Sequence, residues 1–314
     1  MATGTAPEDT LAPVAPLNYA VICLDILGQN AVFSGIPDLI QSRDCLDGIG
    51  KVLKESFGAV RLVRTLIRNM FALSAQARST DPEDPMGRFM PRDIGVFSFA
   101  DTVVSSLPLR SSASVASSLL TMLSVHGTAM AHALAANVAV RGGMAMGWAA
   151  PIGAEGPEIY GPALNRAHHL ENHVAGRPRI VVDQRIVNYL HAITRLTAPE
   201  SAEGKMRAKM ATWALGYIME DTDNVFSLDF LCEASSLLSR RGPPEGFTAM
   251  CHVVDSGHTF AAEQVQRWRA QHCTKLTDRY EATERYYASR LHFWRAEESS
   301  SRDAAMGNLV QPPC

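Results

Sequence analysis

The spacing of apolar positions changes several times along the first third of the chain. Residues 18–27 are an almost unbroken run of apolar and β-branched residues, which predicts a buried strand. Residues 45–77 repeat their apolar side chains at helical spacing, and this predicts one long helix. Residues 94–109 form two short apolar runs that meet at Ala100 and Asp101. They predict a hairpin that carries an acid at its tip.

The next hundred residues alternate between helical and extended patterns. A helix is predicted over residues 114–137, and a strand interrupted by two glycines over residues 138–149. A short helix follows at 161–175, with a proline in its first turn where proline is tolerated, and then a strand at 178–183. The order strand, helix, hairpin, helix, strand, helix, strand predicts an α+β domain with a mostly antiparallel sheet.

Helical patterns dominate the rest of the chain, apart from a predicted strand at 224–230. A single long helix is predicted over residues 259–297, and its aromatic residues suit a docking or dimer face. The chain is thereby predicted to have four parts: a disordered leader (1–16), an α+β domain (17–184), a mainly helical extension (185–298) and a flexible tail (299–314).

Composition excludes some classes of function. Of the 314 residues, 46% are hydrophobic, which is enough for a sizeable core, and the net charge of -3 comes without any basic run. Nucleic acid is therefore not the expected partner. The most apolar stretch is broken by His132 and Arg141, the first residues do not form a signal peptide, and the six cysteines form no CxxC pair. A cytoplasmic protein with reduced thiols and no membrane span is expected.

Two acids stand where predicted strands end. Asp25 closes the apolar run of the first strand, and Asp101 lies at the tip of the hairpin. A buried carboxylate without a partner is unfavourable, so a compensating cation is expected if the two strands are neighbours. Paired carboxylates are the usual ligands of Mg²⁺ and Mn²⁺. The alternative is that both are ordinary acids at strand ends, facing water.

A third element adds an amide and an imidazole. In "IYGPALNRAHHLE" a glycine turn precedes a helix that carries Asn165 and His169. Residues four apart share one face of a helix, so these two side chains are expected to point the same way. Together they have the chemistry to contact a ribose and a phosphate.

Taken in order, these pieces resemble the class III nucleotide cyclases. Members of that family have a strand ending in Asp-Ile, a hairpin with Asp at its tip, a strand Arg-x-Gly-x-x-x-Gly and a helix Gly-x-x-x-Asn. This chain has Asp25-Ile26, Ala100-Asp101, "RGGMAMG" and "GPALN" in that order within residues 17–184. With "PRIVVD" and the helical extension, it looks most like the bacterial pyrimidine cyclases of Pycsar anti-phage defence.

The resemblance implies a fold and a chemistry. It implies a ferredoxin-like catalytic domain in which Asp25, Asp101 and the Ile26 carbonyl hold two divalent cations, Mn²⁺ or Mg²⁺. The loop that begins near Gly28 is then expected to face phosphate oxygens, and Asn165 to orient the ribose. It further implies a homodimer whose sites contain the metal ligands of one subunit and Asn165 of the other. The product acts as a second messenger on a separate cyclic-nucleotide effector.

Three positions depart from the family pattern. His169 stands where many members have a transition-state Arg, and a protonated imidazole supplies part of that charge. Phe97 replaces the Lys that reads adenine in adenylate cyclases, which counts against ATP because a phenyl ring forms no hydrogen bond. Glu158, at the other base-reading position, accepts a hydrogen bond from uracil N3–H or from the cytosine amine. Ordinary core packing for Phe97, a plain helix position for His169 and an exposed loop acid at Glu158 remain open.

The expected substrate is therefore UTP, converted to 3′,5′-cyclic UMP and pyrophosphate, with CTP and cyclic CMP as the alternative. Two rival functions use the same residues differently. His169 and His173 are four apart and have the spacing of two zinc ligands, although a third must come from elsewhere. In the second rival function, the chain is a catalytically inactive cyclase-homology module that binds nucleotide or a partner. The missing helix Arg favours this alternative.

Overall fold

A computed structural model describes six segments of the chain: residues 16–28, 43–76, 94–110, 115–152, 158–195 and 201–295. The predicted leader, apart from its last residue, and the predicted tail lie outside these segments. So does most of the loop that follows Gly28.

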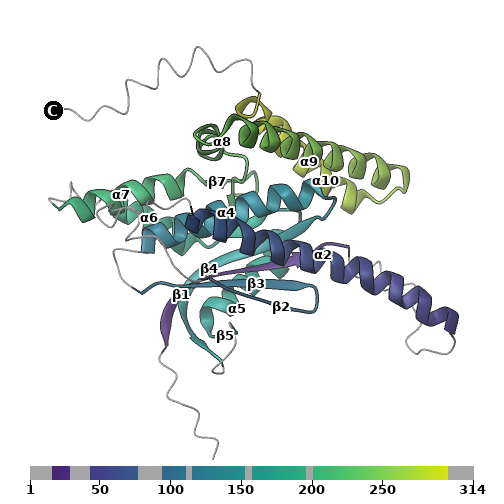
Figure 1. The fold of residues 1–314 in the computed structure, drawn as a ribbon, viewed down its shortest axis with the longest axis horizontal. Coiled ribbons are helices and arrows are strands. Elements are labelled where there is room, and N and C mark those ends of the chain that lie inside the picture. The colour runs from purple at the N-terminus through teal and green to yellow at the C-terminus, as the bar shows by residue number, and fades with distance from the viewer. Residues whose placement is uncertain are drawn as a thin grey trace, which may run out of the picture.

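The described residues contain one eight-stranded sheet (Figure 1). Seven strands follow the order β2-β3-β1-β4-β6-β8-β7, and the short β5 pairs with the end of β4. The strands are β1 (Leu17–Ile26), β2 (Gly95–Phe99), β3 (Thr102–Pro108), β4 (Val140–Pro151), β5 (Ile159–Tyr160), β6 (Ile180–Val182), β7 (Ile218–Glu220) and β8 (Phe226–Leu228).

Helices connect these strands and form the C-terminal part. A π-helical turn, η1 (Leu170–Ala175), extends α5 directly. The helices are α2 (Arg43–Gln76), α4 (Val115–Ala135), α5 (Pro162–His169), α6 (Gln184–Arg195), α7 (Ala202–Leu215), α8 (Glu233–Arg240), α9 (Pro244–Ala270), α10 (Thr274–Arg290) and the 3-10 turn η2 (Leu291–Phe293).

The first six elements form a ferredoxin-like unit. Their order is β1-α2-β2-β3-α4-β4, and the four strands lie side by side as β2-β3-β1-β4 with every neighbouring pair antiparallel. This is the β-α-β-β-α-β arrangement expected of that fold. The predicted α+β class and ferredoxin-like core are confirmed. The predicted strand order along the chain is confirmed as well, since each of those segments forms its strand or helix within a few residues.

The sheet continues beyond the predicted catalytic domain. β6 pairs parallel with β4, and β8 and β7 then add to β6 in antiparallel fashion. Two strands from the predicted helical extension therefore belong to the same sheet as β1. The sheet does not end at residue 184, and the domain boundary predicted there stays a prediction.

The two faces of the sheet differ in what covers them. Alternate residues of β1 point to opposite faces, so Ile22 and Leu24 enter one cluster while Val21 and Cys23 enter the other. The larger cluster includes side chains of α2, α4, α6, α7, α9 and α10. The smaller cluster lies under α5 alone, and Figure 1 shows α5 on the side of the sheet away from α2 and α4.

The glycines of "RGGMAMG" are explained by close packing. A Cβ on Gly143 would overlap the Ala167 carbonyl oxygen and lie 2.6 Å from the Glu171 nitrogen, and one on Gly147 would overlap the Arg166 side chain. α5 and η1 therefore rest directly on the backbone of β4. Gly142, on the other face, would place its Cβ 2.5 Å from a Leu24 methyl carbon.

One prediction for the C-terminal region is wrong. The single helix predicted over residues 259–297 is two helices, α9 and α10, which form a hairpin broken at residues 271–273. His272 has a positive φ of 53°, and neither glycine nor proline marks the break. The aromatic side chains proposed as a docking face are core residues: Tyr287 is fully buried and Trp294 is 3% exposed. Among the described residues, no helix has the length and apolar character needed to cross a membrane.

Candidate functional site

Asp25 lies near the end of β1, between two strands. It is opposite Thr102 on β3 and opposite Arg141 on β4, so these three side chains share one face of the sheet. That face is the one covered by α5, because Cys23 two residues earlier belongs to the small cluster. The sequence places the acid there because the apolar run of β1 continues up to it and side chains alternate between the two faces of a strand.

Asp101 reaches the same region through the β2–β3 hairpin. The two-residue turn contains Ala100 and Asp101, and Ala100 takes a positive φ of 52° that is strained for a residue with a Cβ. Asp101 directly precedes Thr102, the strand partner of Asp25. Burial is the main influence that raises the pKa of Asp25, and the negative charge of Asp101 adds a smaller contribution in the same direction. The strand register thus brings Asp101 to within one residue of the strand partner of Asp25, and a joint role of the two acids stays a prediction.

Arg141 links Asp25 to a third acid. Its Nε donates a hydrogen bond to Asp25 Oδ2 at 2.9 Å, and the same nitrogen lies 3.0 Å from Glu171 Oε1. Because Nε carries a single hydrogen, it serves only one of the two carboxylates. Glu171 Oε1 is accordingly buried without a hydrogen-bond partner among the described residues, and the Glu171 side chain is only 3% exposed.

The pKa values of two acids record this shortage of positive charge. Burial raises the pKa of Asp25, Arg141 opposes that rise, and the charge of Asp101 adds to it. For Glu171, burial and then the charge of Asp25 raise the pKa to about 7, against the lowering effect of Arg141. Asp25 and Glu171 therefore share one guanidinium, and neither is held at the low pKa of a well-paired acid.

The donor set suits hard divalent cations. Two carboxylates and a neighbouring backbone carbonyl are oxygen ligands of the kind that Mg²⁺ and Mn²⁺ prefer, and the net charge of the three acids and Arg141 is negative. Within the described segments, no three His, Cys, Asp or Glu side chains gather closely enough to surround one ion. A site here therefore needs oxygens from outside the protein, such as water or phosphate, to complete the coordination.

Asn165 and His169 lie on the outer surface of α5. Ala163 and Ala167 of the same helix are buried against the sheet, whereas Asn165 and His169 are both exposed. They share one face, as their spacing predicts, but that face points away from their own β1 and β4. In the described part of the chain, no hydrogen bond or ion pair joins either residue to Asp25 or Asp101.

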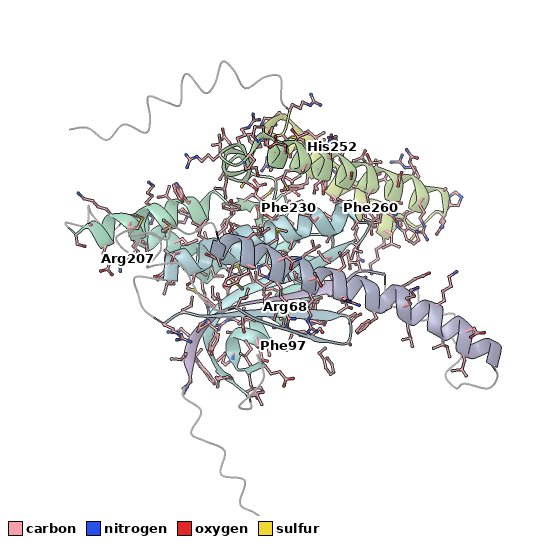
Figure 2. The ribbon with its side chains drawn as sticks, in the orientation of Figure 1. Arg68, Phe97, Arg207, Phe230, His252 and Phe260 are labelled. Carbon is pink, nitrogen blue, oxygen red and sulfur yellow. The ribbon has the colours of Figure 1, made fainter. Side chains whose placement is uncertain are left out.

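The two predicted base-reading residues differ in how far they are exposed to solvent. Phe97 is half-buried in the small cluster, opposite Val104, which is itself opposite Cys23. Phe97, labelled in Figure 2, therefore lies on the face of the sheet that the strand register also gives to Asp25. Glu158 is exposed at the start of β5, and its carbonyl accepts a hydrogen bond from Ile152. Gly28 has a φ of 93°, which only glycine adopts easily, so the chain turns sharply after β1.

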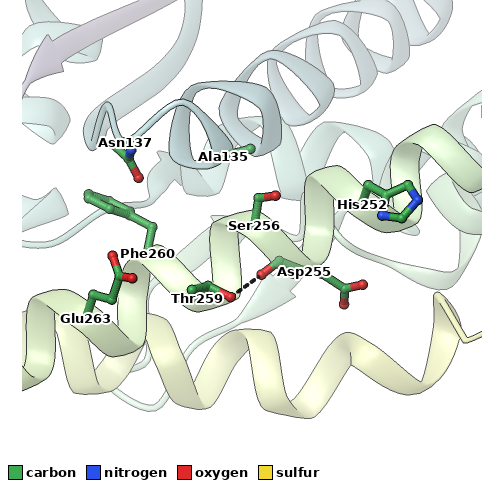
Figure 3. A pocket seen from close by; sticks show the side chains of 8 residues that line it. All are labelled: Ala135, Asn137, His252, Asp255, Ser256, Thr259, Phe260 and Glu263. Atoms are coloured by element: carbon green, nitrogen blue, oxygen red, sulfur yellow. Dashed lines mark hydrogen bonds between the residues drawn. The ribbon is translucent and has the colours of Figure 1, made fainter.

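Two other groups of polar residues do not form this site. The rings of His169 and His173 have centroids 4.9 Å apart and planes tilted by 41°, but the described residues supply no third ligand for a metal there. An open hollow between α4 and α9 is lined by His252, Asp255 and Glu263 among others (Figure 3). It belongs to the opposite side of the sheet from α5, so it has no contact with the acids.

Glu171 was missed by sequence reasoning, and Arg141 was noted as a break in the most apolar stretch. Glu171 lies in "HLENH", where the two histidines drew attention to a zinc site instead. Glu171 follows His169 by two residues, which is about half a helical turn, so it points to the inner side of the helix when His169 points outward. This spacing could have identified Glu171 from the sequence. The pairing of Arg141 with Asp25 depends on the β1–β4 register, which the sequence did not reveal.

Comparisons with known proteins add little to this picture. No protein-family model matches the chain, and no curated protein matches it. Among solved structures it is similar to the crystal structure of the adenylyl cyclase CyaB from P. aeruginosa, at 12% sequence identity and a TM-score of 0.38. The match covers 68% of this chain and 95% of that one. A likeness this loose carries no conclusion about activity, which has to be argued from the site itself.

Proposed function

We propose that the protein is a metal-dependent nucleotide cyclase. The observation that supports this most directly is the excess of carboxylate at the end of β1. Asp25 and Glu171 lie against the one guanidinium of Arg141, Asp101 lies at the neighbouring hairpin tip, and the pKa values of Asp25 and Glu171 are raised. Such an arrangement is unfavourable on its own and becomes favourable once divalent cations bind.

In this proposal Asp25, Asp101 and the Ile26 carbonyl hold two Mn²⁺ or Mg²⁺ ions. When bound, the ions neutralise the triphosphate and lower the pKa of the ribose 3′-hydroxyl. That oxygen attacks the α-phosphorus, the bond to the bridging oxygen breaks, and pyrophosphate leaves. Arg141 gives up its hydrogen bond to Asp25 and turns to the phosphate oxygens. The carboxylate of Glu171 keeps the Arg141 guanidinium near the site.

Asn165 orients the ribose and His169 adds positive charge, but both come from a second subunit. Their exposure on the outer face of α5 supports this, since they point away from the acids of their own chain. Exposed aromatic side chains lie on β2, β4 and β5: Phe99 is 79% exposed, Trp148 52% and Tyr160 65%. A homodimer with two shared sites brings the separated groups together.

The proposed substrate is UTP, with CTP as the alternative. Phe97 presents an apolar ring on the face of the sheet that carries Asp25, and Glu158 is available as a hydrogen-bond acceptor. Neither offers the hydrogen-bond donor that would recognise adenine N1. A cyclic pyrimidine product that activates a separate effector in anti-phage defence is inferred from the sequence resemblance to Pycsar cyclases.

The first experiment is to incubate the full chain with Mn²⁺ and each of ATP, GTP, CTP and UTP in turn, and to identify products by mass. We expect 3′,5′-cyclic UMP, and none from an Asp25→Asn variant. Cyclic CMP as the main product would keep the reaction and change the substrate, whereas cyclic AMP would contradict the roles of Phe97 and Glu158. Nucleotide binding without any product would favour the inactive module, for which the hydrogen bond of Arg141 to Asp25 is the supporting observation.

The shared site has its own test. Asp25→Asn and Asn165→Ala proteins, each inactive alone, are mixed and allowed to exchange subunits. Half of the dimers become mixed and each of these has one intact site, so about a quarter of the wild-type activity returns. Activity that stays absent after mixing, while the mixed dimer is detected by mass, would contradict the division of the site between two subunits.

A further inference from the structure

A second cavity lies at the other edge of the sheet. It has a volume of about 290 Å³ and is enclosed by β7, β8, the segment before β6, and α10. Apolar side chains form much of its wall: Met219, Leu228, Phe230 and Ala282. Phe230, labelled in Figure 2, lies where β8 leads toward the helices of the C-terminal part. β4 and β6 separate this cavity from Asp25, so it is distinct from the proposed active site.

One polar group in the cavity wall has no partner. The Ser227 side chain is 2% exposed and its Oγ has no hydrogen-bond partner among the described residues. The neighbouring hydroxyls are already used: Tyr286 donates to Asp229 at 2.8 Å and accepts from the Leu231 nitrogen, and Thr283 donates to the Arg279 carbonyl. A buried hydroxyl without a partner is unfavourable and calls for an explanation such as a bound molecule.

A cation stands at the mouth of the cavity. Arg285 lines it from α10 and its side chain is 70% exposed. Its ion pair with Glu281 is 3.6 Å long and lies on the helix surface, where such pairs contribute little. The two other lining arginines, Arg177 and Arg179, are held by hydrogen bonds to carboxylates of the β7–β8 turn. Arg285 is therefore the guanidinium that remains free to meet a ligand.

We propose that this cavity binds a small aromatic acid. Its ring lies against Met219, the strand partner of Ser227, and against Ala282 of α10; a hydroxyl on the ring pairs with Ser227, and its carboxylate meets Arg285. A cavity of about 150 Å³ accepts benzene, so the larger volume here leaves room for a ring with a substituent at each end. The site lies between β8 and α10 and does not depend on any cyclase activity.

The probes are 4-hydroxybenzoate, benzoate and 4-hydroxybenzamide, titrated against the full chain and followed by ligand-observed NMR. We expect saturable binding of 4-hydroxybenzoate with a dissociation constant of about 1 mM or below, as suits a ligand of this size. Ser227→Ala should weaken 4-hydroxybenzoate about threefold or more and leave benzoate unchanged, because only the former carries the paired hydroxyl.

Two further variants separate the cavity from the surface. Arg285→Ala should weaken both acids and spare 4-hydroxybenzamide. Arg269→Ala is the matched control, since Arg269 pairs with the same Glu281 and is 66% exposed, but does not line the cavity. Ala282→Leu fills the cavity from α10 and should abolish binding of all three probes while circular dichroism stays unchanged.

Three results would overturn the proposal: no saturable binding of 4-hydroxybenzoate, binding that survives Ala282→Leu, or equal loss on Arg285→Ala and Arg269→Ala. The first would leave Ser227 satisfied by water alone. The last two would assign any binding to the exposed surface of α10.

Discussion

Each face of the central sheet buries a titratable side chain, and the two side chains differ in whether their hydrogen bonds are satisfied. On the α4 face, His126 is completely buried, yet its Nδ1 is hydrogen-bonded to the Met122 carbonyl and its Nε2 to the Ser105 hydroxyl. On the α5 face, Glu171 is almost as buried and its Oε1 has no hydrogen-bond partner among the described residues. Both ring nitrogens of His126 are thus satisfied, whereas Glu171 keeps unsatisfied charge near a carboxylate pair. Unsatisfied groups of that kind are typical of sites that bind ligands.

The largest expected effect is on activity and falls on the α5 face alone. Asp25→Asn or Asp101→Asn removes a metal-ligating charge, so turnover of UTP should fall on the order of 100-fold or more. Asp255→Asn, an exposed acid on α9, is the matched control and should retain full activity. Product formation is measured by mass, and thermal unfolding checks the fold. Equal activity of all three variants would remove the acids from the chemistry.

The two faces should also respond to pH with opposite signs. The pKa of His126 is lowered from 6.5 to about 4 by burial, so its contribution is full above pH 6.5 and is lost as the pH falls toward 4. The pKa of Glu171 is raised from 4.5 to about 7, so its contribution is full below pH 4.5 and is lost as the pH rises toward 7. The change for His126 amounts to roughly 3 kcal/mol, and the change for Glu171 is smaller because solvent partly screens the charges around it. Between pH 4.5 and 6.5 the two changes oppose each other.

Glu171→Gln should therefore reveal the pH dependence that His126 gives to the free energy of unfolding. We expect the free energy of unfolding of this variant to fall on acidification from pH 6.5 to 4.5, while the wild-type protein changes much less. His126→Asn should show the reverse trend, with stability falling as the pH rises. Urea unfolding of the metal-free protein across this range measures both, with Glu263→Gln, on the surface of α9, as the control. Parallel profiles for the wild type and Glu171→Gln would show that Glu171 does not titrate as argued.

Packing on the α5 face can be tested without touching a charge. Gly143→Ala would press a methyl group into the Ala167 carbonyl and the Glu171 backbone, and should destabilise the protein by about 2–3 kcal/mol. Gly58→Ala, in the exposed middle of α2 with open space around its Cα, should instead stabilise by about 0.5–1 kcal/mol. Thermal unfolding distinguishes the two. A harmless Gly143→Ala would mean that α5 can move away from β4.

The smallest effect is expected at the hairpin tip. Ala100→Gly relieves a positive φ of 52° but adds freedom to the unfolded chain, so a net gain of about 0.5 kcal/mol is expected. Asn224, with a φ of 58°, is the comparison, because asparagine tolerates that conformation and Asn224→Gly should change little. A loss of stability on Ala100→Gly would indicate that the Ala100 side chain contributes more than its strain removes.

Much of the fold follows from the sequence because the elements have clean periods. The apolar run of β1, the helical spacing of α2 and the hairpin around Asp101 each predict their own structure and are confirmed. The break between α9 and α10 was not predicted because His272 adopts a left-handed conformation that no glycine or asparagine announces. At the site, the two strand-end acids were predicted from position alone. Arg141 and Glu171 were harder to place, because their roles depend on strand register and on the inward face of η1.

The two strands that follow β6 have a consequence for modularity. Because β8 and β7 extend the sheet from sequence well beyond the four-stranded core, a fragment that stops at residue 184 would expose one edge of β6 to unwanted strand pairing. The same fragment would leave the apolar side of α4 uncovered where α7 and α9 now pack. The part of the chain up to residue 184 therefore cannot be exchanged between proteins as a separate module. Any rearrangement of the gene that joins it to a new C-terminal partner has to bring along an edge strand and a helical cover.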